Sequence, residues 1–136
     1  HNLTPLETVQ AIKAQSALIM VPHPFDRVRT SAMGWATFKE LACYVDIIET
    51  FNARNLFNDD DNKAVDAAHK YRLLFTVVSD AHTAKELGRT YAEMPDFDGT
   101  PEGFKEALSR ATLIRRRTKI IHRLAPAYAK LRKPFT

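Results

Sequence analysis

The stretch Leu73-Leu74-Phe75-Thr76-Val77-Val78-Ser79-Asp80-Ala81-His82 joins a short apolar run to polar residues directly behind it. A bounded apolar run of this length is typical of a strand that is buried on both faces of a parallel sheet. Comparable runs occupy residues 17–21 and 45–49, so the three runs begin at intervals of 28 residues. Each interval has room for one helix, and consecutive right-handed strand–helix crossovers produce this spacing. The sequence therefore predicts an α/β fold with a mainly parallel sheet.

Helices are expected before and between these strands. The sequence Thr4-Pro5-Leu6-Glu7 has the form of a capping box with proline at the first helical position. It predicts a helix ahead of the first strand. A second helix is expected at residues 35–44. A third is expected to open at Asn58 with Asp59-Asp60-Asp61, because acidic side chains favour the positive N-terminal end of a helix.

The composition is that of an ordinary soluble globular chain, with 136 residues, 45% of them hydrophobic and 26% charged. No apolar run approaches the roughly 18 to 20 residues of a membrane-spanning helix. Cys43 is the only cysteine, which excludes an internal disulfide and favours a reducing, cytoplasmic location. We expect its side chain at a small apolar core position. The chain begins with His1 instead of Met, which indicates an excised piece of a longer protein.

Charge divides the chain into two expected parts, residues 1–106 and residues 107–136. The second part has nine Lys and Arg and no acid, whereas the first has 16 acidic and 11 basic side chains. Apolar residues recur in the second part at helical spacing, so we expect a basic C-terminal helix that packs on the acidic body. The alternative is a weak, salt-sensitive contact with the phosphates of a nucleic acid. No contact with a membrane is expected.

Polar residues follow each predicted strand at its carboxyl end. Ligands of parallel sheets bind at this edge, where neighbouring loops converge. His23 follows the first strand, and Asp80 and His82 follow the third. Imidazole and carboxylate together suit zinc, manganese or iron, so we predict that these three residues are metal ligands.

Further polar residues near this edge fit a phosphate-bearing substrate. Arg27, Arg29 and Arg54 are permanent cations, although each is equally suited to a surface ion pair. Glu49 either bridges or orients a ligand, or it bonds to the backbone or to an Arg side chain. The chain contains no G-x-S-x-G sequence, no glycine-rich phosphate loop and no pair of C-x-x-C motifs, so serine-hydrolase and nucleoside-triphosphatase chemistry have no support. Metal-assisted hydrolysis is the remaining class.

Three motifs in order resemble the later motifs of the PHP superfamily, the polymerase and histidinol phosphatase family of metal-dependent phosphoesterases. They are Pro22-His23-Pro24, the stretch from Asp46 to Arg54, and Ser79-Asp80-Ala81-His82 with Leu87-Gly88 after it. The resemblance implies a distorted (β/α)7 barrel that binds up to three divalent metal ions. It implies His23, Asp80 and His82 as ligands, and a phosphorylated small molecule or nucleotide as substrate. Glu49, Asn52 and Arg54 match a motif that lies beside the ligands or the substrate.

The chain departs from the family at its start, because the H-x-H motif and further His and Glu ligands are missing ahead of Pro22. Three predicted strands and 136 residues are also fewer than a full barrel needs. We therefore expect the C-terminal part of a PHP phosphoesterase, inactive as an isolated fragment. Two alternatives are a non-catalytic PHP-like module that binds a partner or nucleic acid through residues 107–136, and metal-dependent hydrolysis of a C–N bond.

Overall fold

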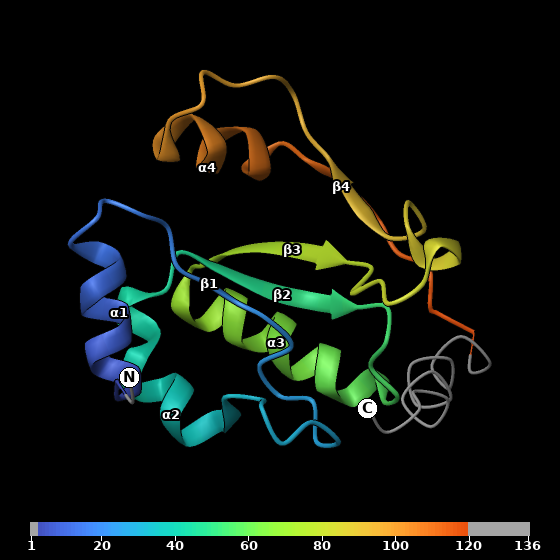
Figure 1. Cartoon of the computed structure of the whole chain (residues 1–136), viewed down its shortest axis with the longest axis horizontal. Helices are drawn as coiled ribbons and strands as arrows, with labels where there is room; N and C mark the ends of the chain where they lie inside the picture. The colour runs from blue at the N-terminus through green and yellow to red at the C-terminus, as the bar shows by residue number, and fades with distance from the viewer. Residues whose placement is uncertain (1–2, 120–136) are drawn as a thin grey trace, which may run out of the picture.

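The computed structural model describes residues 3–119 and has an α/β fold (Figure 1). A three-stranded sheet has the order β1-β2-β3, and a separate two-stranded sheet joins β4 to β5. The elements are α1 (Pro5–Lys13), β1 (Met20–Val21), α2 (Gly34–Leu41), the 3-10 turn η1 (Ala42–Tyr44), β2 (Ile47–Asn52), α3 (Asn58–Tyr71), β3 (Leu74–Val78), the 3-10 turn η2 (Ala84–Glu86), β4 (Tyr91–Glu93), α4 (Pro101–Ser109) and β5 (Thr112–Ile114).

The first three strands are parallel, as the spacing of the apolar runs predicts. Met20 pairs with Ile47, and Ile47 pairs in turn with Leu74. The register between β2 and β3 shifts between Glu49 and Phe51, close to the carboxyl end of β2. Irregularities of this kind re-aim side chains and are common beside functional sites. The α/β class and the parallel sheet are therefore confirmed.

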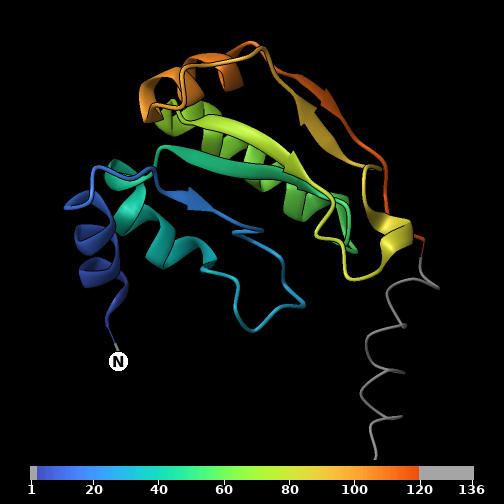
Figure 2. The ribbon, with the colours of Figure 1, turned by 45° about the horizontal axis from the view of Figure 1, so that its top comes forward.

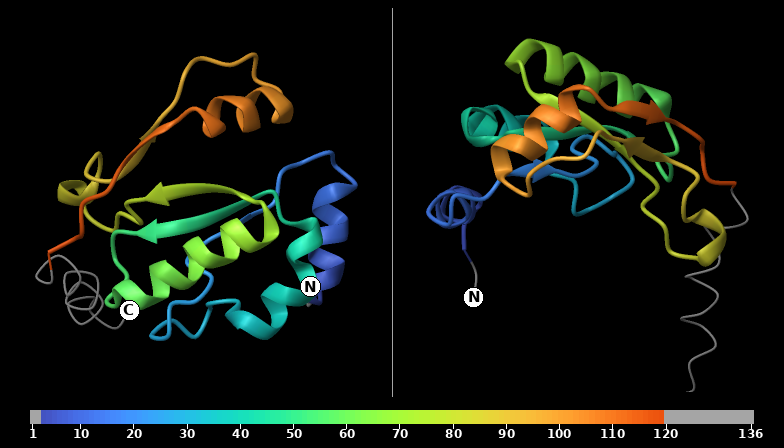
Figure 3. Two further views of the ribbon diagram at one scale, coloured as in Figure 1. Left: turned by 180° about the vertical axis from the view of Figure 1, so that it is seen from behind. Right: turned by 90° about the horizontal axis from the view of Figure 1, so that it is seen from above.

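Helix α3 covers one face of this sheet and lies alongside β2 when the molecule is seen from behind (Figure 3). Ile48 and Phe38 are fully buried between the sheet, α2 and α3. The α3 residues in this cluster are alanines, at positions 64, 67 and 68. Small side chains on the buried stripe let the helix approach the sheet closely, so that the larger rings and branched chains fill the space between them.

The expected capping box opens α1. The Thr4 hydroxyl accepts a hydrogen bond from the Glu7 backbone N–H at 3.2 Å, and the Glu7 carboxylate accepts one from the Thr4 backbone N–H at 2.7 Å. These contacts satisfy donors that a helix start leaves without partners inside the helix. The helix then packs Val9 against Ile19 and Val21 at the first strand. The local signal in the sequence therefore placed this helix correctly.

The second sheet was not predicted. Strands β4 and β5 are antiparallel and lie on the side of β3 away from β1, with α4 between them along the chain (Figure 2). Leu113 and Ile114, expected on a C-terminal helix, instead pair with Ala92 and Tyr91 in this sheet. The expectation of a helix was wrong here because cross-strand pairing with β4 outweighs the helical spacing of apolar residues. The rest of the expected helix lies outside the described residues.

Cys43 corrects another expectation, because its side chain is exposed in η1 and not packed in the core. The 3-10 turn follows α2 directly and buries Ala42 in its place. The apolar neighbours of Cys43 suggested a core position, but the buried position belongs to Ala42, one residue earlier in the chain. Within residues 3–119, none of the helices is long and apolar enough to cross a membrane.

Candidate functional site

Parallel strands bring the predicted site residues to one edge of the sheet. His23 lies two residues beyond the end of β1, Glu49 and Asn52 lie in β2, and Asp80 and His82 follow β3. The arrowheads of β2 and β3 mark this edge in Figure 1. The expectation that three separate segments converge at one edge follows directly from the parallel topology.

Asp80 and His82 approach each other closely. Nε2 of His82 lies 3.4 Å from Oδ1 of Asp80, and Oδ2 of Asp80 accepts a hydrogen bond from the Arg29 guanidinium. The His82 side chain is 45% exposed and that of Asp80 is 20% exposed, so both are open to a ligand from solvent. Asp80 therefore lies between a cation and an imidazole at the rim of the sheet.

The backbone is unusual at two of the predicted ligands. His23 has a φ of 28° and Asp80 a φ of 46°, in the left-handed region that L-residues other than Asn, Asp and His rarely adopt. The other described residues of this kind besides glycine are Ser16 and Arg72, which follow helices α1 and α3. Left-handed residues cost free energy and recur at functional sites. Both His23 and Asp80 thus adopt this conformation directly after a strand end.

Glu49 connects the first strand end to the second. Its buried carboxylate accepts a hydrogen bond from the His23 backbone N–H at 2.9 Å and another from the Asn52 side-chain amide at 3.2 Å. Burial raises the pKa of Glu49 above its ordinary value, against these hydrogen bonds, and the negative charge of Asp80 adds to the rise. The expected bond of Glu49 to the backbone is present in the structure. Through it, Glu49 orients the loop that carries His23.

Glu86 is a site residue that the sequence reasoning missed. Its side chain is fully buried and accepts hydrogen bonds from the backbone N–H groups of His82 at 3.0 Å and Thr83 at 2.9 Å. Its other oxygen lies 2.5 Å from Nη1 of Arg54. Burial alone would raise the pKa of Glu86, but these hydrogen bonds and the charge of Arg54 outweigh it and lower the pKa. The carboxylate therefore fixes the loop of His82.

A sequence signal for Glu86 exists. Thr83 and Glu86 have the spacing of a capping box, and the Thr83 hydroxyl and backbone N–H both contact the Glu86 carboxylate. The same pattern identified the start of α1 correctly. It was overlooked at Glu86 because it opens only the short turn η2 and no long helix.

The two arginines of the loop after β1 have different partners. Arg27 binds Asp60 of α3, with Nη2 at 2.7 Å from Oδ1 and Nε at 2.9 Å from the same oxygen. Arg29 binds Asp26 at 3.1 Å as well as Asp80. Asp26 is buried and was also missed from the sequence. Arg29 thus reaches a predicted ligand, whereas Arg27 ties the loop to α3.

The imidazole of His23 offers a further nitrogen atom that could bind a metal ion at this edge. Within residues 3–119, its Nδ1 atom is buried and has no hydrogen-bond partner. A buried imidazole nitrogen without a partner is costly unless a proton donor or a metal satisfies it. The same described residues contain no preassembled group of three His, Cys, Asp or Glu side chains that would hold a metal ion. The donor types fit a divalent cation, and the ligand set His23, Asp80 and His82 stays a prediction.

Part of the chain matches a known protein family. Residues 58–113 match the family of PHP-associated domains. The matched stretch includes Asp80, His82 and Glu86, so the part of the site that follows β3 lies inside it. The resemblance to the C-terminal part of a PHP superfamily protein is confirmed.

A relative is found in the archaeon Methanocaldococcus jannaschii, the uncharacterised protein MJ0417. It is 33% identical to this chain over 121 residues, which cover 82% of the chain and 51% of the relative. The chain therefore spans about half the length of this relative.

Proposed function

We propose that this chain is the C-terminal part of a distorted (β/α)7 barrel that hydrolyses a phosphate ester with the help of divalent metal ions. The observation that carries the proposal is the shared edge at which His23, Asp80 and His82 follow parallel strands. The close approach of Asp80 and His82 and the left-handed backbone at His23 and Asp80 support it. The match to a PHP-associated family supports the same relationship.

In this proposal His23, Asp80 and His82 hold zinc, manganese or iron. A divalent cation at such a site supplies a Lewis acid that polarises a phosphoryl oxygen and makes water more acidic. Glu49 accepts a hydrogen bond from the backbone N–H of His23, and Glu86 accepts one from the backbone N–H of His82. These bonds fix the backbone from which each imidazole extends. Asn52 holds Glu49 through its side-chain amide.

The cations at the rim would bind the phosphate group. Arg29 already contacts Asp80, and Arg54 lies beside the loop of His82 through Glu86. Guanidinium groups bind phosphate oxygens with paired hydrogen bonds and stabilise the negative charge of the transition state. Arg27 takes less part, because Asp60 engages its guanidinium.

The remaining ligands and the other strands of the barrel would come from the rest of a longer protein. The M. jannaschii relative has about twice the length of the matching region, and up to three ions are expected in the complete barrel. Three ligands on part of a barrel cannot fix a multinuclear site, because such sites need support from all sides. We therefore expect little or no turnover by residues 1–136 alone.

The test is made in the full-length protein. His82→Ala should abolish metal-dependent release of inorganic phosphate from p-nitrophenyl phosphate and lower the bound metal measured by mass spectrometry. His69→Ala is the matched control, because His69 is an exposed histidine near the C-terminal end of α3. Unchanged turnover and metal content in His82→Ala would overturn the proposal.

A second candidate function is binding of nucleic acid through the basic segment at residues 107–136. Arg115, Arg116 and Lys119 are exposed in its described part, which favours contact with phosphates. The affinity of such a contact falls steeply as salt rises. The double variant Arg115→Ala/Arg116→Ala should weaken binding to a labelled RNA at low salt. Absence of binding at low salt would exclude this function.

A further inference from the structure

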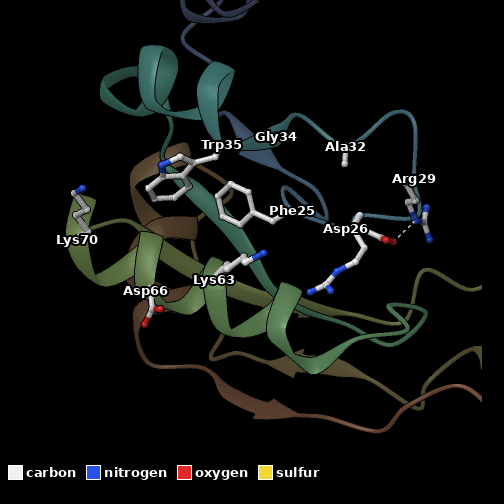
Figure 4. Close-up of a pocket in the computed structure, with 10 residues that line it drawn as sticks. Phe25, Asp26, Arg29, Ala32, Gly34, Trp35, Lys63, Asp66 and Lys70 are labelled. Atoms are coloured by element: carbon white, nitrogen blue, oxygen red, sulfur yellow. Dashed lines mark hydrogen bonds and ion pairs between the residues drawn. The ribbon is translucent and has the colours of Figure 1, made fainter.

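A cavity of about 790 Å³ lies between the loop after β1, the start of α2 and the exposed side of α3 (Figure 4). Neither His23, Asp80 nor His82 lines it. Its volume falls within the range of small-molecule pockets, which combine an apolar wall with a few polar groups. We call it the α2–α3 pocket, lined by Phe25, Asp26, Arg27, Arg29, Ala32, Gly34, Trp35, Lys63, Asp66 and Lys70.

Two aromatic rings form the apolar wall of the pocket. Phe25 is buried, and its ring centroid lies 5.2 Å from that of Trp35. Trp35 also stacks on the buried Phe38, with 6.1 Å between centroids and 20° between planes. Although held by these rings, Trp35 remains 41% exposed. A supported indole with an open surface suits a planar apolar group, because stacking there needs no rearrangement.

Cations face this wall from α3. Lys63 and Lys70 are seven residues apart, so they lie on one side of the helix, and Figure 4 shows both on α3 at the border of the pocket. Lys70 lies over the Trp35 ring at 5.8 Å. Among residues 3–119 Lys63 forms no ion pair, although its charge contributes to the lowered pKa of Asp60. Lys70 forms no ion pair in this part of the chain either, but it already lies over the Trp35 and Tyr71 rings, which leaves Lys63 as the lysine of the pocket that we expect to meet an anionic ligand.

The two arginines of the pocket are already paired with carboxylates, Arg27 with Asp60 and Arg29 with Asp26 and Asp80. Four of its lining residues are basic and two are acidic. One of the acids, Asp26, is buried and already accepts hydrogen bonds from Arg29 and from the Val28 backbone N–H. The other, Asp66, is exposed on α3. With both arginines paired, Lys63 and Lys70 are the cations that remain for an anion in the pocket, and phosphate is an anion that Lys and Arg side chains bind well.

We propose that the α2–α3 pocket binds a phosphorylated ligand with a planar apolar ring, of about the size of a nucleoside monophosphate. The ring stacks on Trp35, and the phosphate group lies at Lys63. The pocket does not include the proposed metal ligands His23, Asp80 and His82, but it shares Arg27 and Arg29 with the rim of the strand edge. Arg29 is the one lining residue that also contacts Asp80.

The sequence provides a direct reporter for this test, because Trp35 is the only tryptophan of the chain. The chain is titrated with AMP, with adenosine and with inorganic phosphate, and the tryptophan emission is excited where adenine does not absorb. AMP should change the emission saturably and bind more tightly than adenosine or phosphate alone. Isothermal titration calorimetry with AMP should give the same affinity.

Lys63→Ala should weaken AMP binding about tenfold, the amount expected for one charge-assisted contact. Lys85→Ala is the matched control, because Lys85 is an exposed lysine of η2 outside the pocket, and it should bind AMP like the wild type. Circular dichroism checks that both variants are folded. The proposal fails if AMP gives no saturable signal, if phosphate alone binds as tightly as AMP, or if the two lysine variants bind equally well.

Discussion

The buried carboxylate of Glu86 accepts a hydrogen bond from the backbone N–H of His82 at 3.0 Å and so fixes the loop of a predicted metal ligand. The same carboxylate pairs with Arg54, which follows β2. One side chain thus joins the ends of the second and third strands. Removing it changes two strand ends together, and the consequences differ for stability and for the proposed activity.

Glu86→Ala should lower the free energy of unfolding by about 3 to 5 kcal/mol, because it leaves the Arg54 guanidinium and two backbone donors without this acceptor in a buried site. Urea denaturation measures the loss. The control is Glu106→Ala, which removes an exposed ion pair to Arg110 at 3.5 Å and should cost less than about 1 kcal/mol. Equal losses in the two variants would contradict the structural role of Glu86.

Acid should remove the stabilisation that Asp60 provides. Burial alone would raise its pKa, but the hydrogen bonds from the side chain and backbone of Arg27 outweigh it, so the pKa in the folded state is lowered. A lowered pKa stabilises the fold above the unfolded value of about 4, and this stabilisation is lost as the pH falls through the folded value.

The measurement compares wild type with Asp60→Asn by urea denaturation from about pH 7 to about pH 3. The stability difference between the two proteins should be largest near neutral pH and shrink in acid. Arg27→Met, which removes the partner of Asp60, should show the same trend. A difference that stays constant over the whole range would show that Asp60 and Arg27 are not coupled through charge.

Arg117 and Arg116 are neighbours, but we expect only the substitution of Arg117 to lower stability. Arg117 binds the Asn52 carbonyl oxygen at 2.6 Å, pairs with the buried Asp61 and lies over the Phe51 ring at 4.4 Å. Burial raises the pKa of Asp61, and the charge of Arg117 opposes this rise. Arg117→Ala leaves that carboxylate without its cation and should cost about 3 kcal/mol.

Arg116→Ala is the control, because the Arg116 side chain is exposed, and it should change stability by no more than about 0.5 kcal/mol. Thermal unfolding followed by circular dichroism separates the two cases. If both variants unfold at the wild-type temperature, residues 115–119 are not anchored to the end of β2 in solution.

Phe38→Ala should destabilise the core by about 3 to 5 kcal/mol, because Phe38 is fully buried between the sheet and α3 and its removal leaves a cavity. Val28→Ala removes an exposed apolar side chain, 55% accessible, and should have almost no effect. Chemical denaturation gives both values. A small loss in Phe38→Ala would mean that the core around Ile48 repacks.

The candidate site could be predicted from the sequence only in outline. The positions of His23, Asp80 and His82 behind apolar runs indicated a common edge, because parallel strands align their carboxyl ends. The contacts between them could not be predicted. Arg29 reaches Asp80 across 51 residues of chain, and Arg54 reaches Glu86 across 32. Such pairs depend on the paths of loops, and no local pattern fixes those paths.

The sequence by itself determined the parallel sheet and the capped start of α1, since apolar runs and capping residues act over a few neighbouring positions. Only the tertiary structure decided the strand pairing of Leu113 and Ile114, the exposure of Cys43 and the partners of Glu86. Each of these depends on segments that are distant along the chain and meet only when the core is packed. Short-range preferences are weak compared with the burial and pairing gained in those contacts, so the contacts prevail.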